Sequence, residues 1–137
     1  MLDQVLYNTS KLHFAPILDA ILECLNSDQQ ELALDLLLIC CTFKNGARVQ
    51  NWSALVSPLI DVLSTNGLDS KRECLLAATI VANADPITSK SVTRKVLEIS
   101  RSKGEQQIGT FCRLVGKLNE TAFHQLVLEE FVKYCLL

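Results

Sequence analysis

The sequence predicts an all-α fold, a right-handed alpha-alpha superhelix built from about three pairs of packed helices. Three observations favour this class. No stretch alternates apolar and polar residues for long, so the pattern of a half-buried strand is missing. The chain divides instead into helix-length blocks that are separated by short polar joints. Part of the block pattern returns after 42 residues, which is typical of solenoid proteins.

Each predicted helix is supported by the spacing of its apolar residues. The predicted blocks cover residues 13–26, 28–43, 52–65, 69–84, 88–102, 105–118 and 120–136. The sixth block shows one apolar stripe at helical spacing, formed by Ile108, Phe111, Cys112, Val115 and Leu118. The last block shows a similar stripe, formed by Phe123, Leu126, Val127, Phe131 and Tyr134. Residues 32–41 and 74–84 are apolar on nearly every side, so we expect other helices to cover both.

The polar joints contain residues that begin or end helices. Asp85 followed by Pro86 should end the fourth block, because proline cannot continue a helix that precedes it. Thr88 or Ser89 is then expected to begin the fifth block. Residues 43–52, FKNGARVQNW, interrupt the apolar sequence with an Asn-Gly pair that suits a helix C-terminus. We interpret this stretch as the joint between two consecutive repeats.

The internal repeat aligns two proline-containing blocks. With the shift of 42 residues, Pro16 to Asp19 falls on Pro58 to Asp61, and Leu38-Ile39 falls on Ile80-Val81. Proline, aspartate and the apolar positions therefore recur together, as they do when one helix pair is used twice.

The second copy of this repeat is similar to a HEAT repeat. Its sequence, PLIDVLSTNGLDSKRECLLAATIVANA, has a proline in the first helix, a polar turn with aspartate and a second helix rich in small residues. The resemblance implies a HEAT/ARM-like alpha-solenoid over residues 1–137. Many HEAT repeats carry an arginine near the positions of Ala33 and Leu75, so these repeats are degenerate. Because Leu136 and Leu137 do not give a polar terminal face, we expect a longer solenoid or a paired chain.

A longer stretch resembles one group of HEAT proteins. Residues 40–63, CCTFKNGARVQNWSALVSPLIDVL, resemble stretches in the very large HEAT-repeat scaffold of the small-subunit processome, the down-regulated-in-metastasis family. This resemblance implies a nucleolar scaffold for ribosome biogenesis that braces pre-ribosomal RNA and protein. It implies no catalytic residues.

Composition excludes several classes of protein. With 137 residues, 49% of them hydrophobic, the chain is large enough to bury the core of one domain. Its longest apolar run, Leu36 to Cys41, is far shorter than the roughly 20 residues of a membrane span. The N-terminal residues lack the pattern of a signal peptide. We therefore expect an intracellular protein, nuclear, nucleolar or cytoplasmic, that is not secreted.

The cysteines and histidines do not indicate a chemical site. None of the six cysteines belongs to a C-x-x-C motif, and all lie among apolar residues, so we expect reduced thiols in the core. His13 and His124 have no Cys or Asp at the spacing of a catalytic triad. Glycine-rich phosphate loops and nucleophile motifs are also missing. We expect no catalytic residue, metal, cofactor or small-molecule substrate.

Charge is distributed unevenly along the chain. Residues 1–43 hold six acids and one base, whereas residues 86–117 hold seven bases and two acids. The candidate contacts to phosphate or to an acidic partner are Lys90, Arg94, Lys95, Arg101, Lys103, Arg113 and Lys117. The candidate contacts at the joint are Lys44, Arg48 and Trp52. The alternative interpretation of the bases is that they form a solvated face without a ligand. The alternative interpretation of Trp52 is that it packs in the core. Glu129 and Glu130 are interpreted as solvated.

These observations favour a non-enzymatic scaffold that binds the proteins of a larger assembly along an extended surface. Two other classes stay open. The bases of residues 90–117 would suit the backbone of RNA or DNA. An importin-like transport adaptor would have the same architecture.

Overall fold

The computed structural model describes residues 11–25, 27–42, 49, 51–67, 71–103 and 108–136, with the side chains of residues 11–14, 103 and 134–136 excepted. The chain forms two compact units, Met1–Asn51 and Trp52–Leu137, and each is described by itself. Helices make up nearly all of the described residues, and none of these residues lies in a strand. The predicted all-α class is confirmed.

The first unit contains a pair of packed helices, α2 (Lys11–Cys24) and α3 (Gln30–Cys41). Both lie within a few residues of their predicted blocks. Helix α3 buries Leu34 and Leu37 completely, but Leu32 stays 54% exposed. The expectation that residues 32–41 are covered on most faces is therefore met only in part. The reason is that α2 is the one described helix of this unit that packs on α3, and a single neighbour covers one side.

The second unit contains the five remaining predicted helices. In chain order its elements are η1 (Trp52–Leu55), α5 (Val56–Asn66), α6 (Lys71–Asn83), α7 (Pro86–Lys103), α8 (Ile108–Leu118), α9 (Glu120–Ala122), η2 (Phe123–Val127) and α10 (Leu128–Leu136). The last three elements follow one another without a break and form a single helix that is interrupted by the wider π-helical turn of η2.

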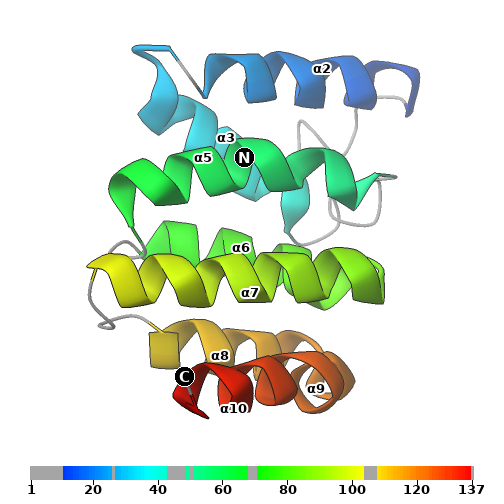
Figure 1. The fold of residues 1–137 in the computed structure, drawn as a ribbon. Helices are drawn as coiled ribbons and strands as arrows, with labels where there is room; N and C mark the ends of the chain where they lie inside the picture. Colours follow the sequence, from blue (N-terminus) through cyan, green and yellow to red (C-terminus); the bar gives the residue numbers. More distant parts are fainter. Residues whose placement is uncertain are drawn as a thin grey trace. The chain divides into compact units, whose positions relative to one another are not determined.

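The helices of the second unit lie in two layers (Figure 1). Helices α5, α7 and α10 form one layer, in which α7 packs on both of the others. Helices α6 and α8 form the second layer, and α6 also packs on α7. The core lies between the layers, with Leu59, Leu76 and Phe111 fully buried.

Helix α6 is the most enclosed helix of this unit. Its residues from Leu76 to Val81 are all buried, as expected from their apolar or small side chains. Thr79 is accommodated because its hydroxyl donates to the carbonyl of Leu75 at 2.7 Å, within the helix itself. The prediction that residues 74–84 form a covered helix is confirmed for this central part.

The joint between α6 and α7 differs from its predicted form. Helix α7 begins at Pro86, two residues before Thr88, because proline is well suited to the first helical position. Asp85 is the capping residue: its side chain accepts bonds from the Thr88 amide at 3.0 Å and the Thr88 hydroxyl at 2.7 Å. These two bonds lower the pKa of Asp85, and the bond from the Thr88 hydroxyl has the larger effect. Ser89 is instead buried, and its hydroxyl donates to the carbonyl of Val81 at 2.7 Å.

The prediction that the cysteines lie in the core is only partly correct. Cys40, Cys41 and Cys74 are buried. Burial is the main cause that raises the pKa of Cys41 to about 12, and the neighbouring Cys40 is the second cause. Cys24, however, is exposed at the C-terminal end of α2, and Cys112 is half-buried. An apolar sequence neighbourhood did not place these two thiols in the core, because each lies at the border of its helix's buried face.

A single side chain joins the end of α6 to the start of α9. The side-chain oxygen of Asn119, Oδ1, accepts a hydrogen bond from the backbone amide of Ala122 at 3.1 Å, which caps α9. The side-chain nitrogen of Asn119, Nδ2, donates to the backbone carbonyl of Ala82 at 2.9 Å. The side chain therefore satisfies two backbone groups in segments 37 residues apart.

We expect Asn119→Ala to lower the free energy of unfolding by about 1–3 kcal/mol, because it removes a cap and leaves a carbonyl unsatisfied. Asn119→Ser should retain the cap, lose the bond to Ala82 and give a smaller loss. Urea unfolding of the three proteins measures both effects. If the serine variant is as unstable as the alanine variant, the cap has no separate contribution.

Candidate functional site

The seven candidate bases do not form one surface. Lys90, Arg94, Lys95 and Arg101 lie on α7, whereas Arg113 and Lys117 lie on α8, in the other layer. The side chain of Lys103 lies outside the described residues, as do Lys44 and Arg48 at the predicted joint. The two groups on α7 and α8 must therefore be judged separately.

The bases on α7 are largely engaged by acids of the same unit. Arg94 donates to both carboxylate oxygens of Glu130, from Nη2 to Oε1 at 3.0 Å and from Nε to Oε2 at 3.3 Å. Lys90 lies 3.9 Å from Glu129, and Lys95 lies 3.6 Å from Glu98. Arg101 also has an interaction within the protein. Lys90, Arg94 and Lys95 therefore each lie beside a carboxylate of the same unit.

Glu130 is not the solvated acid that the sequence suggested. Its side chain is only 4% exposed, because α10 packs against α7 and brings the carboxylate under Arg94. The hydrogen bond from Arg94 lowers the pKa of Glu130, and the same bond raises the pKa of Arg94. Both groups therefore stay charged, and the pair joins α7 to α10. Glu129, at 51% side-chain exposure, is accessible to solvent as predicted.

We expect Glu130→Gln to lower the free energy of unfolding by about 1–2 kcal/mol, since it breaks a charged, two-bond contact. The matched change Glu129→Gln removes an exposed carboxylate and should cost less than about 0.5 kcal/mol. Denaturant unfolding at neutral pH tests the difference. Equal losses in the two variants would contradict a structural role for the Arg94–Glu130 pair.

The same pair predicts a dependence on pH. The pKa of Glu130 is lower in the folded protein than its ordinary value of 4.5. Its contribution is therefore fully present above that ordinary value, and it is lost as the pH falls through the lowered folded value. The stability difference between wild type and Glu130→Gln should shrink in acid. A difference that stays constant between about pH 7 and about pH 3 would contradict this assignment.

The bases on α8 are different. Arg113 and Lys117 are both exposed and lie one helical turn apart. Neither makes an ion pair with any residue that the structure describes. Like charges at this spacing repel each other by roughly 0.2–0.5 kcal/mol. The surface of α8 thus holds positive charge that the described part of the fold does not neutralise.

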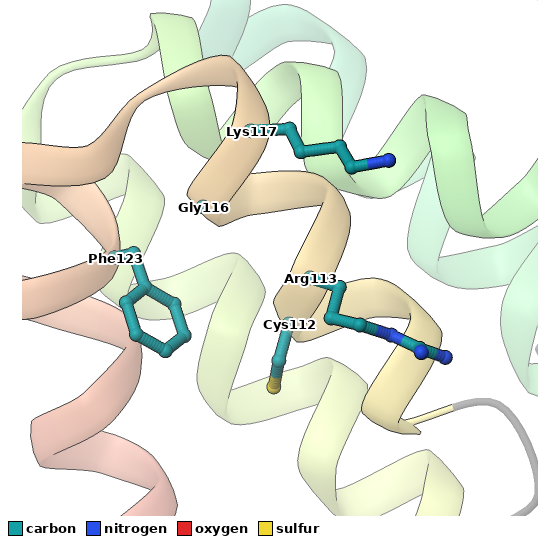
Figure 2. A pocket seen from close by; sticks show the side chains of 5 residues that line it. All are labelled: Cys112, Arg113, Gly116, Lys117 and Phe123. Carbon is teal, nitrogen blue, oxygen red and sulfur yellow. The ribbon is translucent and has the colours of Figure 1, made fainter.

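An open hollow lies between α8 and η2, beside these bases. It has a volume of about 380 Å³, is lined by Cys112, Arg113, Gly116, Lys117 and Phe123, and is almost wholly apolar. Figure 2 shows the thiol of Cys112 and the ring of Phe123 on one side of α8, whereas the side chains of Arg113 and Lys117 extend away from the ring. The α8 surface therefore combines an apolar hollow with a charged border.

The Cys112 thiol that lines the hollow is not activated as a nucleophile. Burial raises the pKa of the Cys112 thiol, which keeps it in the weakly reactive protonated form at neutral pH. Phe123 is half-buried, and its ring meets the ring of His124 edge to face, with centroids 5.4 Å apart. The imidazole Nε2 of His124 lies 3.7 Å from Oε1 of Glu120, and both side chains are strongly exposed.

Sequence reasoning assigned part of this surface to the core and missed the rest. The apolar stripes predict burial of Cys112 and Phe123, yet Phe111 and Val115 are the buried members on α8, and Leu118 is 49% exposed. The apolar stripe is wider than the area that the neighbouring helices cover. The signal in the sequence for the rest of this surface is Gly116, because a glycine one turn after Cys112 in an apolar stripe indicates a shallow helix face.

The remaining predictions concern Trp52 and bound groups. Trp52 begins η1 and is half-buried, a position between the predicted core packing and an exposed anchor. Within the described ranges, no group of three or more His, Cys, Asp or Glu side chains is placed to hold a metal ion. No helix in that same part of the chain is both long and apolar enough to cross a membrane.

The fold and this surface together define a class: in the described residues the chain is all-helical, and its second unit packs helices in two layers and has an apolar hollow beside exposed bases on α8. Comparison with known proteins adds no narrower assignment. No protein-family model matches the chain, and no curated protein or solved structure matches it either.

Proposed function

We propose that the chain forms a right-handed HEAT-like α-solenoid that acts as a non-enzymatic scaffold and binds partner proteins along its surface. In this proposal each repeat is formed by consecutive helices, α5 with α6 and α7 with α8, and the two repeats contact each other through α6 and α7. The repeated frame of Pro16 and Pro58, each inside the first helix of a pair, supports the same division.

The observation that carries the proposal is contact between helices two positions apart. Helix α5 packs on α7, α7 packs on α10, and α6 packs on α8. In a simple four-helix bundle, by contrast, helices two positions apart lie diagonally across the core and contact each other least. Stacked pairs need the observed order, because each helix rests on its equivalent in the preceding pair.

Nucleic-acid binding by the whole stretch from residue 90 to 117 is less well supported. Lys90, Arg94 and Lys95 lie beside acids of the same unit, and the carboxylates of Glu129, Glu130 and Glu98 would repel a phosphate there. The free bases on α8 border an apolar hollow, which suits protein side chains better than a sugar-phosphate backbone.

The resemblance of residues 40–63 to the processome scaffold suggests where partners should be sought. We extend the proposal to a pre-ribosomal assembly in the nucleolus on that resemblance alone. Residues 43–48 and 50 of this stretch lie outside the described part of the chain.

The test is recovery of partners on the immobilised chain from cell lysate, with and without nuclease. A protein scaffold should retain its protein partners after nuclease treatment, and raising the salt from about 50 to about 200 mM should weaken recovery only modestly. The control is Lys71→Glu, which reverses an exposed base on α6 and should leave recovery unchanged.

Three results would contradict the proposal. Loss of all partners with nuclease, together with a steep decline in recovery as salt rises, would indicate a phosphate-backbone binder. Release of the partners by a GTP-loaded small GTPase would indicate a transport adaptor. Failure to retain any protein under gentle conditions would remove the support for a scaffold.

A further inference from the structure

One surface of the second unit combines apolar area that no described helix covers with charge that no described residue neutralises. The apolar area is the hollow formed by Cys112, Gly116 and Phe123. The charge is that of Arg113 and Lys117. The other bases with described side chains on the predicted stripe each have an interaction within the fold, whereas Arg113 and Lys117 have none with a described residue.

We propose that this surface, hereafter the α8 surface, binds an amphipathic helix of a partner protein. An apolar side chain of that helix enters the hollow, and acidic side chains beside it contact Arg113 and Lys117. The inference rests on the proposed scaffold function and names the chemical class of its partner.

The size and shape of the hollow favour a protein side chain over a small molecule. A volume of about 380 Å³ is near the lower end for ligand pockets, which usually enclose most of their ligand. This hollow is open to solvent and lies between the ridges of two adjacent helical segments, α8 and η2. Such a groove accepts the ridge of side chains on a third helix.

Gly116 makes the close approach of another helix possible. A Cβ added at this position would meet only the ring of Phe123, at the ordinary contact distance of 3.8 Å. Packing within the described fold therefore does not require a glycine here, although glycine in a helix interior costs up to about 1 kcal/mol relative to alanine. Its missing side chain leaves backbone accessible beside the hollow, which is a position where a partner can pack closely.

The border charges select an acidic partner. Arg113 and Lys117 are separated by one helical turn, the same spacing as two glutamates at positions i and i+4 of a partner helix. Carboxylates placed there would remove the repulsion between the two bases. A basic helix would increase that repulsion, and a neutral one would leave it unchanged, so charge distinguishes partners that are equally apolar.

The experiment measures binding of a fluorescein-labelled amphipathic peptide of about five helical turns. Its leucine stripe is flanked by glutamates. Two companion peptides have lysine in place of the glutamates or serine in place of the leucines. The full chain is added to each labelled peptide at concentrations up to about 1 mM, and the fluorescence polarisation of the peptide gives the dissociation constants.

Two variants test the surface, and each has a matched control. Gly116→Leu fills the hollow, and Gly109→Leu adds the same side chain on α8 where nothing lies within 4 Å of the new Cβ. Lys117→Glu reverses a border charge, and Lys71→Glu reverses an exposed base on α6. Circular dichroism and thermal unfolding test whether each variant remains folded.

We expect the glutamate peptide to bind, with affinity reduced about tenfold or more by Gly116→Leu and by Lys117→Glu but not by either control. The lysine and serine peptides should bind at least about tenfold more weakly than the glutamate peptide. Equal binding of all three peptides, equal effects of variants and controls, or no binding of the glutamate peptide would overturn the proposal.

Failure here is distinguishable from failure of the scaffold function. If Gly116→Leu and Lys117→Glu still recover the nuclease-resistant partners from lysate, the chain is a scaffold that binds through another surface, and the α8 proposal is wrong. If the wild-type chain recovers no protein partner, the scaffold function itself is wrong.

Discussion

The enclosed centre of α6 is the constraint on which the second unit depends. From Leu76 to Val81 every residue is buried, so this helix has almost no side that can face water. Such a helix is stable only where neighbours cover it on several sides. Helices α7 and α8 supply this cover, and α5 and α10 extend the outer layer on either side of α7. The small side chains of α6, among them Ala77 and Ala78, let these neighbours approach closely.

Polar groups at the joints then fix how the helices follow one another. Asp85 caps α7, Ser89 donates to the end of α6, and Asn119 connects the end of α6 to the start of α9. Each bond satisfies a backbone group that a helix end would otherwise leave without a partner. The Arg94–Glu130 pair adds a connection between α7 and α10. The order of packing is thus determined by apolar burial, and the register by a few directional bonds.

The division of the basic residues between two helices has consequences for function. On α7 positive charge is largely taken up by acids from α7 itself and from α10, and it contributes to packing. On α8 two bases stand beside an apolar hollow with no acid of the described fold to engage them. Net charge along the chain therefore overstates the extent of the positive surface, because sequence distance does not show which acids fold back onto which bases. The candidate surface is smaller than the predicted stripe, but its apolar and charged parts are contiguous.

The amino-acid sequence by itself determined the helices, because each one depends on local spacing. The stripe through Phe111 and Val115, the apolar centre of α6 and the Asp85-Pro86 stop can all be recognised without knowing what lies nearby. The tertiary structure alone decided which flanks of those helices stay uncovered. It buried Glu130 under Arg94, left Cys112 and Phe123 at the edge of a hollow, and introduced a π turn at η2. Periodicity predicts the direction in which a side chain points, but burial and charge pairing depend on a second helix that is distant in sequence.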